Sequence, residues 1–170
     1  MLPTLRTLGL VLVCAASLSL GSCRSTCCAS AASDAEGVAR AKQSYFAAWT
    51  KQAGQAFDPA TLTATVENSD DFLSFDGMSP TGTVIQGWKN FSGLWIPGMN
   101  QFRRASLSEA KPLRTWISGD LALTASIAHI QGETADGHEL DMLGHLTLGY
   151  ARRDGRWQIV HEHMSLNVKE

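Results

Sequence analysis

The segment "LGYARRDGRWQIVHEHMSL", residues 148–166, decides the fold because it has the pattern of two strands joined at Asp154-Gly155. An Asp-Gly pair between segments of alternating apolar and polar residues is typical of a two-residue β-hairpin turn. Similar segments precede this one, and they are separated by Gly119-Asp120 and Asp136-Gly137. The sequence therefore predicts four long strands in consecutive antiparallel hairpins: 102–116, 121–131, 139–152 and 156–167.

Helices are expected before these strands. From a cap at Ser33 or Asp34, apolar residues recur on one helical stripe: Val38, Ala41, Tyr45, Ala48 and Trp49. A short helix is predicted to begin at Asp58-Pro59, a strand covers "DDFLSFDG" at 70–77, and "TVIQGWKNFSGLWIPG" at 83–98 has helical spacing. This order predicts an α+β fold, in which the N-terminal helices pack on the concave face of a curved antiparallel sheet.

The composition limits the kinds of partner. The chain has 170 residues, a net charge of −2 and a charged fraction of 18%, and its basic residues form no run. Nucleic acid is an unsuitable partner, since neutralising its phosphates requires clustered Lys and Arg. The length favours one folded domain.

The first residues have the pattern of a targeting segment. A positive start is followed by an apolar core at 8–20 that is too short for a stable membrane span, and "LGSC" at 20–23 resembles a bacterial lipobox. We therefore expect a signal peptide at 1–22, a lipidated Cys23, a tether at 23–33 and a domain at 34–170. The alternative is an ordinary secretory signal cut at "ASA", 29–31. Either processing predicts an extracytoplasmic protein, in the periplasm or cell envelope, and the lipid anchor would be its only membrane contact.

The hairpin turns also predict which side chains share a face of the sheet. With two-residue loops at Asp154-Gly155 and Asp136-Gly137, counting outward from each turn assigns the directly opposed residues, which point to the same side. The predicted inner face carries Leu121, Leu123, Ala125, Ile127, His129, Leu146, Leu148, Tyr150, Trp157, Ile159, His161 and His163. Tyr45, Trp49 and Trp88 of the helices would cover it, while His145 and Glu162 would point outward.

Three hypotheses compete for the inner histidines: a metal site, a ligand pocket, or core histidines with hydrogen-bond partners. The histidines fall on two strands that flank a third, about 10 Å apart, which is too far for a shared metal ion. All four cysteines precede residue 29, so the folded part has no thiolate ligands. We therefore expect a pocket without metal or cofactor, with His161 or His163 as acid or base and Asp76 at its mouth. Its walls would be His129, Tyr45, Trp49, Trp88, Leu146, Leu148 and Tyr150.

Four features together resemble a known family. These are the long first helix, "GWKNF" at 87–91, "WISGDLALT" at 116–124 and "DGRWQIVHEHMS" at 154–165. They are similar to SnoaL-like members of the nuclear transport factor 2-like superfamily over residues 34–167. The resemblance implies a cone-shaped α+β fold, and relatives that include ketosteroid isomerase, scytalone dehydratase and polyketide cyclases. The aspartate–tyrosine set of ketosteroid isomerase finds no match on the predicted inner face.

Two functions follow from these expectations. The first is a lipid-anchored protein that binds a small apolar or cyclic molecule without chemistry. The alternative is a cofactor-independent lyase or isomerase that uses a pocket histidine as acid or base. A homodimer through the outer face of the sheet is compatible with both.

Overall fold

A computed structural model of the chain describes residues 23–79 and 84–166. Three α-helices, a short 3-10 helix and six strands occur in these ranges. In chain order they are α1 (Cys23–Ala48), α2 (Ala60–Thr65), β1 (Leu73–Asp76), β2 (Val84–Gln86), α3 (Trp88–Gly98), η1 (Met99–Gln101), β3 (Phe102–Ser118), β4 (Leu121–Thr134), β5 (Glu139–Arg153) and β6 (Arg156–Leu166). The four predicted long strands are confirmed, each to within a few residues.

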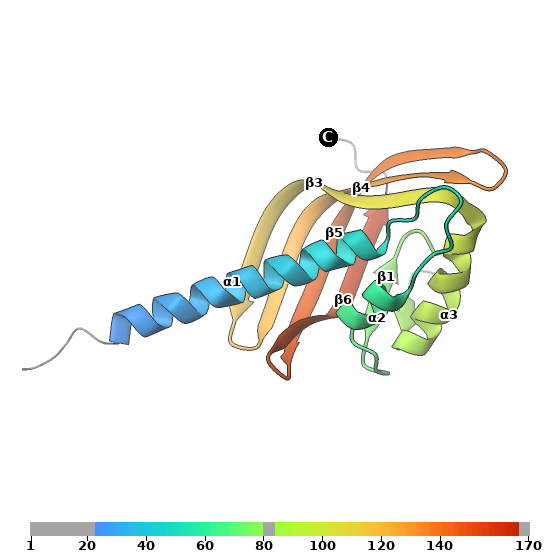
Figure 1. The fold of residues 1–170 in the computed structure, drawn as a ribbon. Coiled ribbons are helices and arrows are strands. Elements are labelled where there is room, and N and C mark those ends of the chain that lie inside the picture. Colours follow the sequence, from blue (N-terminus) through green and yellow to red (C-terminus); the bar gives the residue numbers. More distant parts are fainter. Residues whose placement is uncertain (1–22, 80–83, 167–170) are drawn as a thin grey trace, which may run out of the picture.

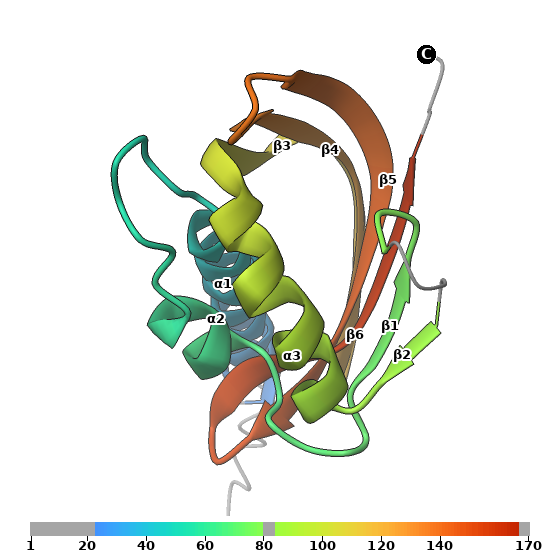
Figure 2. The ribbon, with the colours of Figure 1, turned by 90° about the vertical axis from the view of Figure 1, so that its right-hand side faces the viewer.

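The six strands form one curved sheet in the order β2-β1-β6-β5-β4-β3. Strands β1 and β6 are parallel, and every other neighbouring pair is antiparallel. Figure 1 shows α1 crossing the concave face of this sheet, and the turned view in Figure 2 shows α1, α2 and α3 on that same side. The predicted α+β fold, with helices covering the concave face, is therefore confirmed.

The core lies between the helices and the concave face. Its fully buried side chains come from α1, from the segment around α2 and β1, from α3, and from the middle of β5 and β6: Val38, Tyr45, Leu62, Val66, Phe72, Phe91, Leu146, Leu148, Tyr150 and Ile159. Gly37 lets α1 approach the sheet closely, since a Cβ at this position would lie 2.6 Å from Cδ1 of Trp157. Ion pairs add to this packing, with Lys42 Nζ 2.7 Å from Glu109 Oε1 on β3.

Two predicted elements differ from the structure at their ends. Helix α1 begins at Cys23 rather than at Ser33 or Asp34, so the predicted tether is helical. The helix expected across 83–98 is a short strand, β2, followed by α3. Gly87 separates these two elements, and its φ of 80° favours glycine and ends the strand. The predicted signal peptide at 1–22 lies outside the described residues.

The predicted facing of β4 is wrong. Thr134 and His138 pair across the β4–β5 turn, so the loop has three residues, 135–137, in place of the expected two. Gly137, with φ 90°, occupies the left-handed position typical of such loops. One extra loop residue shifts the register by one and turns every β4 side chain to the other face. The concave positions of β4 are Ala122, Thr124, Ser126, Ala128 and Ile130, while Leu121, Leu123, Ala125, Ile127 and His129 lie on the convex face.

The predicted facing of β6 is correct only for its first half. The turn at Asp154-Gly155 has two residues with positive φ, as expected, and Tyr150 opposes Ile159. The register then shifts, so that Gly149 opposes His161, and Val160 is the extra residue of a β-bulge. Beyond Val160 every side chain is turned to the face opposite to the predicted one.

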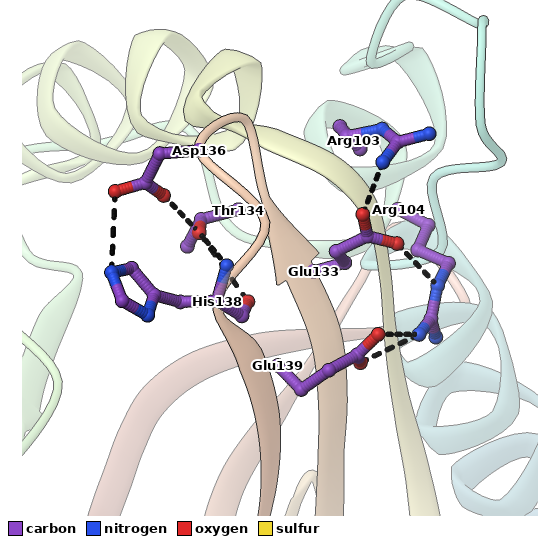
Figure 3. A network of polar contacts seen from close by, with 7 residues as sticks. All are labelled: Arg103, Arg104, Glu133, Thr134, Asp136, His138 and Glu139. Carbon is purple, nitrogen blue, oxygen red and sulfur yellow. Dashed lines mark hydrogen bonds and ion pairs between the residues drawn. The ribbon is translucent and has the colours of Figure 1, made fainter.

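Exposed ionic contacts join β3, β4 and β5 near the β4–β5 turn (Figure 3). Glu133 on β4 pairs with both Arg103 and Arg104 of β3, and Arg104 reaches across to Glu139 of β5. These contacts join three strands at the end of the sheet where the β4–β5 turn projects.

In the described ranges, 23–79 and 84–166, no helix combines the length and apolar character that a membrane span requires.

Candidate active site

A cavity lies between the helices and the concave face of the sheet. It contains about 590 Å³ of space that no atom fills, including its opening to solvent. The lining residues come from α1, the β1 end, α3, η1 and four strands: Tyr45, Trp49, Asp76, Met78, Trp95, Met99, Phe102, Ala105, Ser106, Leu107, Ile130, Gln131, Leu140, Glu162 and Met164.

Glu162 is a deeply buried acid of this cavity. The bulge at Val160 turns its side chain to the concave face, where it is 3% exposed. The Tyr45 hydroxyl on α1 donates a hydrogen bond to its Oε2, and Ser74 Oγ on β1 lies 3.4 Å from its Oε1. The carboxyl therefore has polar partners on both oxygens but no cationic partner among them.

Asp76 provides a second acid from the neighbouring parallel strand. Alternation along β1 places Ser74 and Asp76 on the concave face, and Asp76 is 3% exposed. The backbone N–H of Met78 donates to Asp76 Oδ1 at 2.7 Å, which fixes the carboxyl at the end of β1. Strand β1 pairs in parallel with β6, with Ser74 opposite Glu162 and Asp76 opposite Met164. The two acids therefore lie on adjacent strands and the same face.

Burial changes the protonation of both acids. Desolvation, and next the nearby Asp76 carboxyl, raise the pKa of Glu162 to about 8. Desolvation also raises the pKa of Asp76, against the lowering effect of its hydrogen bonds. Near neutral pH, Glu162 therefore carries a proton, and the charge of the Asp76 carboxylate is one of the causes that raise its pKa. Two acids with separated pKa values in one cavity are typical of acid–base sites.

Tyr45 and Glu162 together hold a proton that can be donated. Burial raises the pKa of Tyr45 well above its usual value, so the phenol stays protonated. The pair then has two acidic protons, and the hydrogen bond between them uses one. The second proton is available for an oxygen atom in the cavity, with Ser74 as a distant alternative partner.

Two indole N–H groups complete the polar wall. Trp49 Nε1 and Trp95 Nε1 are buried, and neither has an acceptor in hydrogen-bonding geometry among the described residues. Weak N–H contacts from Trp49 to Tyr45 and from Trp95 to Asp76 nevertheless lower the pKa of each of these two acceptors.

The predicted site residues divide into three groups: residues that line the cavity, residues buried in the core, and histidines on the convex face. Tyr45, Trp49 and Asp76 line the cavity, as expected. Four others are buried in the core but do not line the cavity: Trp88, Leu146, Leu148 and Tyr150.

The three predicted pocket histidines lie on the convex face. His161 is half-buried, with Nδ1 2.9 Å from the Leu73 carbonyl oxygen, and His163 is exposed. His129 Nε2 lies 2.6 Å from Asp141 Oδ1, also outside the cavity. Their predicted convergence on the concave side is wrong, because of the bulge at Val160 and the three-residue β4–β5 loop. Within residues 23–79 and 84–166, no three His, Cys, Asp or Glu side chains are grouped so that they could hold a metal ion.

Glu162 is the main residue that sequence reasoning missed, and its expected outward orientation is wrong. Its only sequence signal is its position between two histidines. Without the bulge, strand alternation assigns these histidines to the concave face and Glu162 to the convex face. Trp95 and the three cavity methionines were also missed. Trp95 and Met99 depend on the path of the chain around α3 and η1, Met78 on the end of β1, and Met164 on the bulge at Val160.

Comparisons with known proteins agree with this architecture. Residues 42–169 match the SnoaL-like domain. A nuclear transport factor 2-like superfamily protein from Salmonella enterica is 22% identical over 79% of this chain and 88% of its own, with a TM-score of 0.61. A proposed ketosteroid isomerase from Shewanella frigidimarina is 23% identical over 74% and 92%, with a TM-score of 0.58. A proposed dehydratase of the same superfamily from Streptomyces avermitilis is 17% identical over 81% and 98%, with a TM-score of 0.65.

At these identities the solved structures show the shared fold alone. No curated protein matches the sequence. The family match covers most of the chain, and the curved sheet with helices on its concave face is the fold of the nuclear transport factor 2-like structures. The chain therefore belongs to the SnoaL-like domain family.

Proposed function

We propose that this protein is a cofactor-independent isomerase or lyase that moves a proton on a small, mainly apolar molecule. The observation that carries the proposal is the buried pair Asp76 and Glu162 in an apolar cavity, with Tyr45 hydrogen-bonded to Glu162. The Glu162 carboxyl favours its neutral form near pH 7, and the charge of the Asp76 carboxylate is one of the causes that raise its pKa. Such a pair provides a base and a proton donor in one site.

In the proposed isomerase reaction, the Asp76 carboxylate removes a proton from the carbon next to a carbonyl, which gives an enolate, and the protonated Asp76 returns the proton to the γ-carbon as the double bond moves. In a lyase reaction the same enolate expels a β-hydroxyl group, which leaves as water with the proton that Asp76 removed. The Glu162–Tyr45 pair donates a hydrogen bond to the substrate oxygen, where negative charge develops. The apolar surroundings strengthen both interactions because little water competes. Asp76 and Glu162 thus take the acid–base roles that the sequence suggested for His161 and His163. The proposed isomerase and dehydratase among the similar structures are compatible with this chemistry.

Deuterium exchange tests the proposal without knowledge of the natural substrate. The full-length protein is incubated in D₂O with small cyclic β,γ-unsaturated ketones, and NMR follows exchange and double-bond migration. Asp76→Asn should lower the catalysed rate by about 100-fold or more, and Glu162→Gln should also lower it. His161→Ala is the matched control on the other face of β6 and should leave the rate unchanged. Binding of the ketones without exchange would indicate a ligand-binding protein, and loss of exchange in the histidine variant alone would contradict the assignment.

We also propose that Cys23 is lipidated and that the protein is tethered in the cell envelope. The motif "LGSC" at 20–23, after an apolar segment, supports this. Cells labelled with a fatty-acid analogue should incorporate it into the wild type and not into Cys23→Ala. A mature N-terminus at Ala32 or Ser33 would contradict the anchor.

A homodimer through the convex face remains our proposal for the oligomeric state. Large apolar side chains are exposed on this face at Trp116, Leu121 and Leu123. Exposed apolar clusters of this kind are typical of protein–protein contacts. Sedimentation of the wild type and of Leu123→Lys at equal concentration would test it, with a monomeric variant as the expected result.

A further inference from the structure

The charged groups of the cavity are all acidic. Among the lining residues, Asp76 and Glu162 are the ionisable carboxyls, and the lining includes no Lys, Arg or His. The buried Lys51 contacts two of the lining residues, but its Nζ donates to the Met99 and Phe102 carbonyl oxygens. It is not among the groups that shift the pKa of either acid. An anionic ligand would therefore meet acids without a compensating cation in the wall.

Three aromatic rings pack edge to face along the helical side of the cavity. Tyr45 and Trp49 are 6.0 Å apart between ring centroids with an interplanar angle of 75°, and Trp49 and Trp95 are 6.0 Å apart at 81°. All three rings also line the cavity, so part of each can contact a ligand. Positive charge near an aromatic face is stabilised by the ring quadrupole, most strongly by Trp.

We infer that the cavity selects an organic cation, a substituted ammonium group, over neutral and anionic molecules of the same shape. The aromatic side chains on α1 and α3 would contact its alkyl groups, and the Asp76 carboxylate would balance its charge. A charge in an apolar cavity is costly unless it is paired, and a bound ammonium group would pair with the Asp76 carboxylate, whose pKa is raised by burial without such a partner. The inference rests on the proposed function only in taking this cavity as the ligand site, and does not require proton transfer.

Three isosteric probes test this inference directly. Choline carries a trimethylammonium group, 3,3-dimethyl-1-butanol replaces its nitrogen by carbon, and 3,3-dimethylbutanoate carries a negative charge. Titration calorimetry with the full-length protein should show choline binding about tenfold more tightly than the alcohol, with no binding of the butanoate. Asp76→Asn should remove the preference for choline while the alcohol still binds. Asp141→Asn, an exposed acid on the convex face, is the matched control and should retain the preference.

Equal or tighter binding of the alcohol by the wild type would overturn the inference, as would binding of the butanoate or failure of choline to bind. These results do not depend on the folding of any variant. The deuterium-exchange experiment reports separately on the proposed function. Exchange on ketones together with failure of choline binding would reject the cation selectivity alone, whereas choline binding without any exchange would reject proton transfer alone.

Discussion

The two faces of β6 carry polar residues with opposite environments. On the convex face, His161 and His163 contact the exposed Phe75 ring, with centroids 5.3 and 5.8 Å away. On the concave face, Glu162 between them is buried against Tyr45 and Ser74. Polarity alone would place the carboxylate outside, since carboxylates are among the side chains least often buried. The bulge at Val160, and not the residue type, decides which of them reaches the cavity.

On strand β4, too, residue polarity does not predict the facing, because polar side chains are buried and large apolar ones are exposed. Its concave face carries the small hydroxyl residues Thr124 and Ser126, and its convex face carries Leu121 and Leu123. Thr124 Oγ1 lies 3.1 Å from the Tyr150 hydroxyl oxygen, so the buried hydroxyls of Thr124 and Tyr150 form a hydrogen bond with each other. In this first part of β4 the largest apolar side chains therefore lie on the outer face, contrary to the usual pattern for a half-buried sheet.

Paired deletions would test the role of the bulge most strongly. Removing Thr147 from the regular part of β5 should turn Leu146 or Leu148 away from the core, because a one-residue slip reverses the facing. The loss of buried leucines costs roughly 2–5 kcal/mol each, comparable to the whole stability of a domain. We expect no cooperative unfolding transition by circular dichroism.

Removing Val160 should have a much smaller effect. Val160 is the extra residue of the bulge, so its deletion leaves Ile159 opposite Tyr150 and Glu162 opposite Leu148. The deletion variant should fold and melt cooperatively at a reduced temperature. Equal damage from both deletions would show that Val160 does not form a bulge.

Much of the fold follows from local sequence signals, as the hairpins show. Asp154-Gly155 predicts both the turn and its two-residue length, and Tyr150 and Ile159 pair as expected. The turn at Asp136-Gly137 is also predicted, but its length is not, since Ala135 can join the loop without any change in the Asp-Gly signal. Turn positions are thus local properties, whereas register depends on how the whole sheet packs.

Two leucine truncations compare the faces at the level of single side chains. Leu148 on β5 is 1% exposed and Leu123 on β4 is 38% exposed. Leu148→Ala should lower the free energy of unfolding by roughly 2–5 kcal/mol, because it leaves a cavity in the core. Leu123→Ala should lower it by less than about 1 kcal/mol in urea titrations at low protein concentration. A larger effect at Leu123 would favour the two-residue loop and return Leu123 to the concave face.

The buried Glu162 should make stability depend on pH. Its pKa is raised from 4.5 to about 8 on folding, so the folded state binds more protons than the unfolded state between these values. Stability is then fully present below about pH 4.5 and is lost as the pH rises through about 8. We expect the melting temperature to fall by roughly 5 °C between pH 5 and pH 8.5, and less in Glu162→Gln. His163→Gln is the matched convex-face control and should show the same slope as the wild type.

The candidate site was only partly predictable, for a reason visible in these residues. Tyr45, Trp49 and Asp76 were identified because helix periodicity and strand alternation place them without reference to register. Glu162 was missed because its orientation depends on one bulge residue, and a bulge has no fixed sequence pattern. The error also placed three histidines at the site, since His129, His161 and His163 all lie beyond the two register shifts.

The smallest expected effect concerns His161, at the boundary between the two environments. Burial is the main cause that lowers the pKa of His161 from its ordinary value of 6.5, opposed by its hydrogen bond to the Leu73 carbonyl. The charge of neighbouring His163 also lowers this pKa. Titration of the ring nitrogens by NMR should give a value below 6.5 in the wild type. In His163→Ala the pKa of His161 should rise slightly, because one repulsion is removed while burial remains. A fall in this variant would indicate that His163 stabilises the His161 cation.

An unchanged pKa of His161 in Glu162→Gln would agree with a carboxyl on the opposite face of the strand, whereas a drop of about one unit would indicate that the carboxylate lies beside the imidazoles.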